Sequence, residues 1–560
     1  MRVPELKPFR MGSMAAVQHR ATTRTSNSDS TKTAKSKTTS SSTTKRKRAR
    51  TATATPPAAL QGLASEAPAP TIEVNEPGQF GRINVMDITP AEERGIFPAR
   101  VELGEPFEMT AQVFIEGRTK VGATAIVRNP RGKETLRRPM TCVNPGLDRW
   151  VVTVKCGDHS DLKPWEDGYA AVKRQLGEWT VTVEGWEDTY ISWLHDARIK
   201  VRVKDDVNNA LDSGAELLAR WAATPDANLT ARDRKTLEKA AETMADASLS
   251  AEDRLAAGDN PRIATLHDTH PLRDGISPSQ PQCFKVERPK SSFAAWYQFF
   301  PRSEGATINP ATGKIVQGTL KTSMAGLERA AAEGFDIVYL PPIFPIGVTN
   351  RKGRNNSLIA GPDDPGSPFG IGSELGGHDT VDPLLGTMDD FKALCQRAHE
   401  LGLEIALDFA LQCSPDHPWV KAHPAWFKHK PDDTIAFAEN PPKKYQDIYP
   451  IDFNADMAGI EKEVERIMNL WIEAGVTIFR IDNPHTKPVR FWQDVIAAVT
   501  KKHPEILFLA EAFTRPGMMR ALSYVGFTQS HCYFPWRNTK EELEEYLPTT
   551  NGDDGYYQHN

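Results

Sequence analysis

The stretch VTIFRIDNPH, residues 476–485, places an arginine and a carboxylate directly after a short apolar run. A run of β-branched and aromatic residues of this length is typical of a buried strand in a parallel sheet. Side chains alternate along a strand, so Arg480 and Asp482 are expected to point to the same side. A barrel of parallel strands builds its active site at the carboxyl ends of its strands, so Asp482 is predicted to lie at that rim.

A second carboxylate follows the next apolar run. Residues 506–510 predict a strand, and Glu511 comes directly after it, 29 residues after Asp482, which leaves room for one helix between the strands. Two carboxylates on neighbouring strand ends are the groups used in glycosyl transfer, one as nucleophile and one as general acid/base. A lone carboxylate would more often cap a helix or form a salt bridge, but the joint placement favours catalysis. We expect Arg480 to keep Asp482 ionised.

Strands and helices alternate on both sides of these two motifs, which predicts a β/α barrel. The predicted strands are residues 293–300, 335–340, 404–410, 476–481, 506–510 and 526–534. Thr387 and Asp390 predict a capping box at the start of a helix that Gly402 ends. Six strand–helix steps fit before Asn560, so the predicted TIM barrel of (β/α)8 type is expected to be truncated after about six steps.

Changes in composition and periodicity divide the rest of the chain. Residues 1–70 are rich in Ser, Thr, Ala, Lys and Pro, which predicts a disordered basic tail. Short β-rich runs between turn residues predict an N-terminal β-sandwich over residues 71–204, and helical periodicity predicts a helical insert over residues 205–280. The catalytic β/α barrel is assigned to residues 281–548, and residues 549–560 are assigned to a separate tail.

Charge and cysteine content exclude several functions. The net charge is -5 at pH 7, but residues 1–50 carry +11, so the remaining 510 residues carry -16. An acidic body repels polyanions, which argues against nucleic acid as a partner, and no apolar run approaches the roughly 18 residues of a membrane span. The six cysteines include no CxxC pair, so neither a disulfide framework nor a zinc ribbon is indicated, and a cytoplasmic location is expected.

Five separated motifs resemble the α-amylase clan, glycoside hydrolase family 13, and within it the bacterial maltosyltransferases that use maltose 1-phosphate to extend α-1,4-glucan. The motifs are WYQFFPR (296–302), LPPIFP (340–345), ALDFALQCSPDHPW (406–419), NPPKKY (440–445) and FRIDNPHTKP (479–488). They agree in order and spacing, and the likeness runs over residues 72–547. Gln412-Cys413 stands where most of the clan has Asn-His, a change that the maltosyltransferases share.

The resemblance implies a retaining transfer that uses no metal and no organic cofactor. It makes Asp482 the nucleophile that forms a β-maltosyl ester and Glu511 the acid/base. The other positions that it assigns to substrate are Asn440, Lys443, Tyr445 and Asn483 at the phosphate, Lys352, Gln412 and Asp447 at the donor sugars, and Arg480 and His378 beside them.

Some of these residues have an equally ordinary structural interpretation. His378 alone could as well be a structural histidine. Neighbouring residues of an extended loop face opposite ways, so Lys443 is assigned to the phosphate and Lys444 is not. Large aromatic residues usually belong to the core, and a core position is expected for each of Trp296, Trp419 and Trp536.

The sequence leaves three functions open. The first is transfer of maltosyl from maltose 1-phosphate to the non-reducing end of an α-1,4-glucan or maltooligosaccharide. For this function the resemblance implies a homodimer. The second is an inactive remnant that at most binds glucan, because the clan's third carboxylate has no counterpart before Asn560. The third is an α-glucan hydrolase, against which the loop over residues 440–445 argues.

Overall fold

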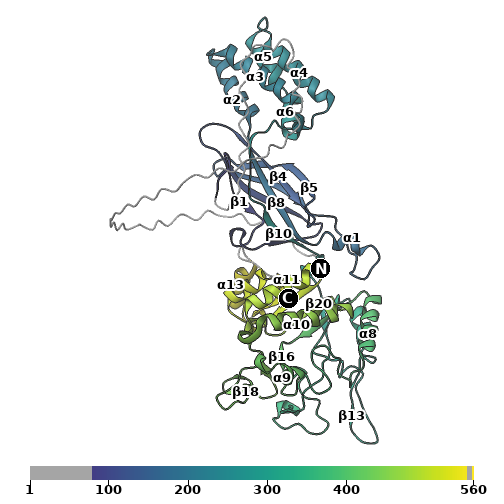
Figure 1. The fold of residues 1–560 in the computed structure, drawn as a ribbon. Helices are drawn as coiled ribbons and strands as arrows, with labels where there is room; N and C mark the ends of the chain where they lie inside the picture. The colour runs from purple at the N-terminus through teal and green to yellow at the C-terminus, as the bar shows by residue number, and fades with distance from the viewer. Residues whose placement is uncertain (1–78, 552–557, 560) are drawn as a thin grey trace, which may run out of the picture. The chain divides into compact units, whose positions relative to one another are not determined.

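The structure is a computed structural model, and it describes residues 79–551 and 558–559 (Figure 1). Two β-sheets form its N-terminal part. The first has the order β1-β3-β7-β6, over Asn84–Thr89, Pro106–Phe114, Arg149–Lys155 and Thr141–Asn144. The second has the order β2-β10-β8-β4-β5, over Ala99–Glu102, Gln282–Glu287, Gly177–Glu187, Val121–Arg128 and Glu134–Pro139. The predicted tail over residues 1–70 lies outside the described residues.

The two sheets share one hydrophobic core. Met109, Ala111 and Val113 alternate along β3 and are buried, because every second side chain of a strand faces the same way. Val181 and Val183 of β8 are buried in the same cluster. This period of two is the pattern from which the sequence predicted a sandwich.

The helical segment begins earlier than the predicted residue 205. Its helices are α2 (Thr189–Val203), α3 (Val207–Ala223), α4 (Ala231–Ala245), α5 (Ala251–Gly258) and α6 (Pro261–Thr269), which gather into one bundle (Figure 1). The Asp188 carboxylate accepts a hydrogen bond from the Ile191 N–H and caps α2 directly after β8. After α6 the chain returns to the sandwich, where β9 (Asp274–Pro278) and β10 both pair with β8.

A seven-stranded parallel sheet forms the second half of the chain and corresponds to part of a TIM barrel. Its order is β11-β14-β15-β20-β21-β22-β23, over Trp296–Gln298, Ile337–Leu340, Glu404–Phe409, Ile478–Ile481, Leu507–Glu511, Gln529–His531 and Gln558–His559. The first six strands lie inside or overlap the predicted runs. The seventh comes from the predicted tail over residues 549–560, which therefore contributes to the sheet.

Helices connect these strands. They are α7 (Met324–Ala332), α8 (Met388–Glu400), α10 (Phe453–Glu473), α11 (Val489–Lys502), α12 (Pro516–Tyr524) and α13 (Lys540–Asn551). The predicted capping box of Thr387 and Asp390 is present at the start of α8. Helix α10 buries Ile460, Val464 and Trp471 along one face, as helical spacing requires.

Side chains from alternate strand positions occupy successive layers inside the sheet. The first layer consists of Ile337, Ala406, Ile478 and Leu507, together with Ala294. Two residues further along their strands come Tyr339, Asp408 and Arg480, which hydrogen-bond one another. Two residues beyond Arg480 lies Asp482. The interior thus changes from apolar to charged toward the carboxyl ends of the strands, where barrel enzymes place their chemistry.

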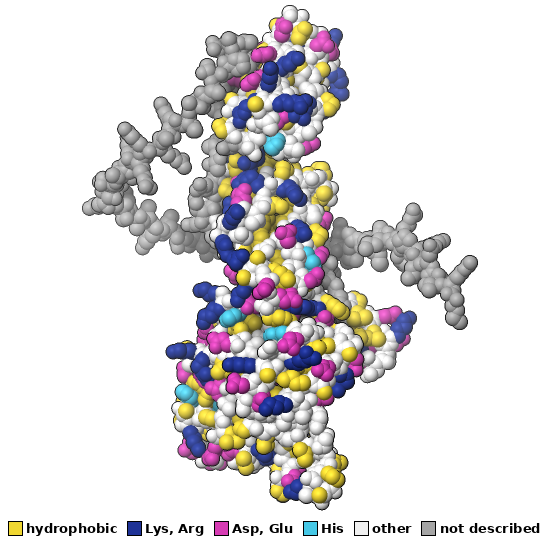
Figure 2. All heavy atoms as spheres, turned by 90° about the vertical axis from the view of Figure 1, so that its right-hand side faces the viewer, with side chains coloured by type: hydrophobic (Ala, Val, Ile, Leu, Met, Phe, Trp, Pro, Cys, Tyr) yellow, Lys and Arg dark blue, Asp and Glu magenta, His cyan; other side chains and the backbone are white. Residues whose placement is uncertain are grey.

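The surface of the described residues carries both signs of charge. Lys and Arg side chains are interspersed with Asp and Glu side chains over the face that Figure 2 shows. Within residues 79–551, no helix is both long enough and apolar enough to cross a bilayer.

A buried ion pair lies at the amino-terminal ends of the barrel strands, away from the charged layer. Arg288 Nη1 donates to Glu404 Oε1 at 2.7 Å, and Arg288 Nε donates to the carbonyl of Glu505 at 2.7 Å. Thr477 Oγ1 donates to the other Glu404 oxygen at 2.7 Å. Both partners of such a pair are needed for stability, because removal of one would leave the other as a buried charge with no counter-ion.

We predict that Arg288→Met lowers the free energy of unfolding by about 3–5 kcal/mol, because Glu404 stays buried without a cation. Urea unfolding followed by tryptophan fluorescence measures the change. The control, Lys314→Met, breaks an exposed pair with Asp363 and should cost less than about 1 kcal/mol. Equal losses of unfolding free energy in the two variants would contradict the stabilising role of the buried pair.

Candidate active site

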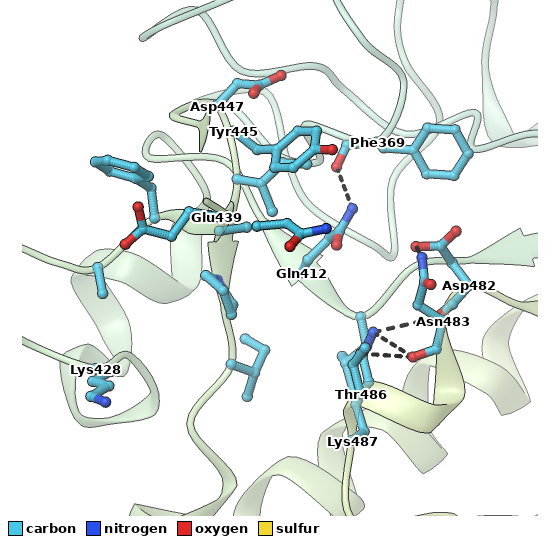
Figure 3. A pocket seen from close by; sticks show the side chains of 18 of the residues that line it. Phe369, Gln412, Lys428, Glu439, Tyr445, Asp447, Asp482, Asn483, Thr486 and Lys487 are labelled. Atoms are coloured by element: carbon cyan, nitrogen blue, oxygen red, sulfur yellow. Dashed lines mark hydrogen bonds between the residues drawn. The ribbon is translucent and has the colours of Figure 1, made fainter. Parts of the chain in front are cut away.

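A cavity of about 1100 Å³ opens beside the carboxyl ends of β20 and β21. Figure 3 shows Asp482, Asn483 and Lys487 on one side of it, with Gln412, Tyr445 and Asp447 further across. Its lining includes nine of the predicted residues: Lys352, Gln412, Asn440, Tyr445, Asp447, Arg480, Asp482, Asn483 and Glu511. The structure therefore brings together residues that lie up to 159 positions apart in the sequence.

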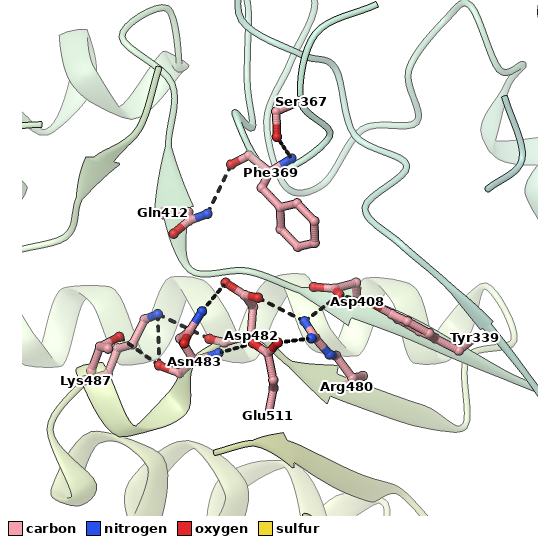
Figure 4. A network of polar contacts seen from close by, with 11 residues as sticks. Tyr339, Ser367, Phe369, Asp408, Gln412, Arg480, Asp482, Asn483, Lys487 and Glu511 are labelled. Carbon is pink, nitrogen blue, oxygen red and sulfur yellow. Dashed lines mark hydrogen bonds and ion pairs between the residues drawn. The ribbon is translucent and has the colours of Figure 1, made fainter. Parts of the chain in front are cut away.

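The guanidinium of Arg480 binds three carboxylates next to this cavity (Figure 4). Its Nη1 lies 2.8 Å from Asp408 Oδ2 and 3.0 Å from Asp482 Oδ1, and its Nη2 lies 2.7 Å from Glu511 Oε1. These groups meet because the parallel register pairs Asp408 with Arg480 and Ile481 with the residue before Glu511. Three of the four side chains come from adjacent strands, and Asp482 follows directly after β20.

Burial and charge act on these groups in opposite directions. Burial raises the pKa of Asp408 to about 7, while Arg480 acts to lower it. Burial also raises the pKa of Glu511 to about 7, against Arg480, and the negative charge of Asp482 raises it further. Asp408 and Glu511 therefore both titrate near neutral pH, and each is affected by the same guanidinium.

Asn483 connects the two carboxylates at the rim. It adopts a left-handed conformation, with φ 43° and ψ 54°, which asparagine tolerates better than most residues. Its backbone N–H donates to Glu511 Oε2 at 3.2 Å, and its Nδ2 donates to Asp482 Oδ2 at 3.3 Å. One turn thus fixes the orientation of both Asp482 and Glu511.

Polar side chains on the opposite wall keep hydrogen-bonding capacity for a ligand. Gln412 donates its Nε2 to the Phe369 carbonyl at 3.2 Å, which leaves its amide oxygen available. Lys352 Nζ donates to Gln446 Oε1 at 3.2 Å and lies 3.9 Å from Asp447 Oδ1. That Asp447 oxygen is buried and has no hydrogen-bond partner in the described part of the chain. Such groups suit sugar hydroxyls.

The hairpin of β17 (Ala438–Asn440) and β18 (Lys443–Tyr445) supplies a third wall. Asn440 pairs with Lys443, and Ala438 pairs with Tyr445, so these four residues share one face of the hairpin. Asn440 and Tyr445 line the cavity, whereas Lys443 is exposed and does not. The structure therefore leaves Lys443 at the edge of the site.

His378 lies outside the cavity, contrary to its predicted place at the sugar. It is buried, and its Nε2 donates to the Ala410 carbonyl at 2.9 Å. Its Nδ1 accepts from His417 Nε2 at 3.1 Å, since His417 Nδ1 accepts from the Trp419 N–H. Burial lowers the pKa of His378 to about 4, so the ring stays neutral and is a structural residue. The core position expected for Trp419 is confirmed, as its ring stacks on His378.

A family model described as "Alpha-1,4-glucan:maltose-1-phosphate maltosyltransferase, domain N/S" matches residues 81–288. A protein named alpha-1,4-glucan:maltose-1-phosphate maltosyltransferase from Bifidobacterium longum is 90% identical over 551 residues, which cover 98% of this chain and 74% of that protein. This chain belongs to that family. A protein of the same name from Bifidobacterium animalis subsp. lactis is 70% identical over 496 residues, covering 89% of this chain and 68% of that protein.

Among solved structures, an α-amylase from Lactobacillus plantarum matches with a TM-score of 0.37 and 26% identity. The match covers 47% of this chain and 60% of the amylase chain.

One cluster of three buried side chains has the composition of a metal site. The ligand atoms of His378, Cys413 and His417 lie within 4.8 Å of one another. Both imidazoles already use their two nitrogens in hydrogen bonds, and burial raises the pKa of the Cys413 thiol, which keeps it protonated. A metal would have to break this network, so the residues do not fit one.

Sequence reasoning missed several members of the site. Tyr339 binds Asp408 from the neighbouring strand, and Phe369 comes from a long loop. Lys487 lines the cavity although it follows the strand end by several residues. Tyr339 and Lys487 had a signal, because Tyr339 lies on a predicted strand and Lys487 belongs to the motif that contains Asp482. Trp536 is 53% exposed, so the expectation of a core position was wrong for it.

We predict that Arg480→Gln increases proton binding near neutral pH. Removing the cation should raise the pKa of both Asp408 and Glu511 from about 7, so the variant should bind about one more proton per molecule at about pH 7.5. Potentiometric titration against the unsubstituted chain measures the difference. The control, Arg397→Gln, removes an arginine that pairs with exposed carboxylates and should leave the titration near neutrality unchanged.

Proposed function

We propose that this chain transfers a maltosyl group from maltose 1-phosphate to the non-reducing end of α-1,4-glucan and releases phosphate. The relatives that carry this name support the activity, since the first of them is 90% identical. The observation that carries the chemistry is that Asp482 and Glu511 share the Arg480 guanidinium beside a large cavity. The hydrolase and the inactive remnant are not favoured over the transferase that these names indicate.

Asp482 acts as the nucleophile. Its carboxylate attacks the anomeric carbon of the donor, the bond from that carbon to the phosphate oxygen breaks, and phosphate leaves with the electron pair. The acceptor 4-hydroxyl then attacks the same carbon and displaces the Asp482 ester. Two inversions give net retention. The binding of Asp482 and Glu511 to the two terminal nitrogens of one guanidinium, at 3.0 and 2.7 Å, supports this course, since retaining enzymes hold their two carboxyls close together.

Glu511 acts as the acid/base. Phosphate is a good leaving group and needs little protonation, so the main task of Glu511 is to take the proton from the acceptor hydroxyl. A pKa of about 7 leaves a large share of Glu511 as carboxylate at neutral pH. Arg480 contributes by opposing the effect of burial.

The remaining cavity residues bind the donor in this proposal. Asn440, Tyr445 and Asn483 contact the phosphate, and Lys443 approaches it from the edge of the hairpin. Lys352, Gln412 and Asp447 bind the sugars. The cavity of about 1100 Å³ exceeds the usual size of a small-ligand pocket, which leaves room for part of the acceptor. A homodimer and a cytoplasmic location stay predictions.

The proposed function predicts phosphate release when the chain is incubated with maltose 1-phosphate and a maltooligosaccharide. Asp482→Asn should lower the rate at least about a thousandfold, because an amide cannot form the ester. Asp494→Asn makes the same substitution at an ion pair on α11 and should retain the rate. A colorimetric phosphate assay measures all three. Absence of release from the unsubstituted chain would reject the function.

Glu511→Gln should separate the two steps. We expect a burst of about one phosphate per active site followed by slow turnover, since the amide cannot accept the acceptor's proton. In the unsubstituted chain the second step needs the carboxylate, so its rate should fall as the pH drops below about 7. Rapid-quench kinetics between pH 5.5 and 8.5 tests both points. A second step that is independent of pH would argue against the role of Glu511.

A further inference from the structure

Lys487 lies in the loop between the short helix η7 (Pro484–Thr486) and α11, and its side chain turns back toward the strand end. It is buried, and its Nζ donates to the carbonyl of Asp482 at 3.2 Å and to the carbonyl of Asn483 at 3.2 Å (Figure 4). It also lines the cavity. A buried ammonium on the two carbonyls that follow a parallel strand balances the partial negative charge gathered there.

These two carbonyls belong to the turn that orients the reactive carboxylates. The Asn483 carbonyl also accepts hydrogen bonds from the Thr486 N–H at 3.1 Å and from Thr486 Oγ1 at 2.7 Å. The same Asn483 is left-handed and donates its two N–H groups to Asp482 and Glu511. A change in this turn would therefore move both carboxylates at once.

We propose that Lys487 is a positioning residue of the transfer reaction, whose ammonium holds the Asp482–Asn483 turn and places a positive charge beside Asp482 and Glu511. The proposal rests on the function proposed above and adds a residue to it. Lys487 acts through Asp482 and Asn483, and the phosphate of the donor is not its target.

Charged groups on every neighbouring element act on this ammonium. Burial lowers the pKa of Lys487 to about 8, while Asp482 after β20, Glu511 of β21 and Asp408 of β15 oppose that effect. Arg480 lowers it further, and Lys487 in turn helps to lower the pKa of His485 in η7, where burial is the main cause. Lys487 is therefore charged at neutral pH and loses its proton as the pH rises through about 8. Its loss should raise the pKa of Glu511, whose carboxylate interacts with this ammonium.

The test compares Lys487→Met and Lys487→Arg with Lys501→Met, which makes the same substitution at an exposed lysine near the end of α11. The donors are maltose 1-phosphate and α-maltosyl fluoride, which carries no phosphate. We expect Lys487→Met to lower kcat about 10- to 100-fold with both donors, with KM for maltose 1-phosphate changed less than about threefold. We also expect a shift in the pH profile of kcat/KM for the maltooligosaccharide acceptor. The acidic limb of that profile should move to higher pH by about half a pH unit or more.

Three outcomes would overturn the proposal. One is a kcat for Lys487→Met equal to that of Lys501→Met. Another is a loss confined to maltose 1-phosphate, which would make Lys487 a phosphate contact. The third is a lowered kcat with an unmoved acidic limb, which would make its role one of packing alone. If the unsubstituted chain releases no phosphate, the proposed function fails, independently of these comparisons.

Lys487→Arg gives a second test in case the methionine variant does not fold. It retains the charge, so the acidic limb should stay in place. In the unsubstituted chain, deprotonation of Lys487 should give the activity profile a basic limb near pH 8. Arginine does not titrate there, so this limb should move to higher pH in the variant. An unchanged basic limb would overturn the role of the ammonium.

Discussion

The site depends on one guanidinium that three carboxylates share. Without Arg480, Asp408, Asp482 and Glu511 would be three acids in a poorly solvated space, and mutual repulsion together with burial would favour their neutral forms. With it, the cluster keeps negative charge on some of its members near neutral pH. This balance lets two carboxylates with the same chemistry take different roles, because Glu511 binds its proton more tightly than a solvent-exposed glutamate does.

That interaction is possible because of the two-residue period of the strands. Ile478 lies in an apolar layer, Arg480 lies in the polar layer above it, and Asp482 lies at the rim. The residues between them, Phe479 and Ile481, pack in the hydrophobic cluster on the other side of the sheet. The apolar layer positions the sheet, and the sheet positions the charges, so the accuracy of the site rests on packing that takes no part in the chemistry.

The strand ends could be predicted from the sequence, because an apolar run followed by a carboxylate is a local signal. Asp482, Glu511 and Arg480 were found in this way, and the structure places all three together. The return of β9 and β10 to the sandwich could not be predicted, since it depends on pairing across the whole helical segment. The burial of His378 and the backward turn of Lys487 depend on tertiary contacts, which no local pattern records.

The proposed donor also explains the electrostatic design of the site. A sugar leaving group would need a proton at the moment of bond breaking, which favours a protonated acid. Phosphate departs without one, so the acid/base residue can be biased toward its carboxylate form, as the acceptor step requires. Burial raises the pKa of Glu511, and Arg480 from the strand limits that rise, while the Lys487 ammonium of the turn interacts with the same carboxylate. A site arranged in this way suits deprotonation of the acceptor hydroxyl. It is less suited to protonation of a sugar leaving group.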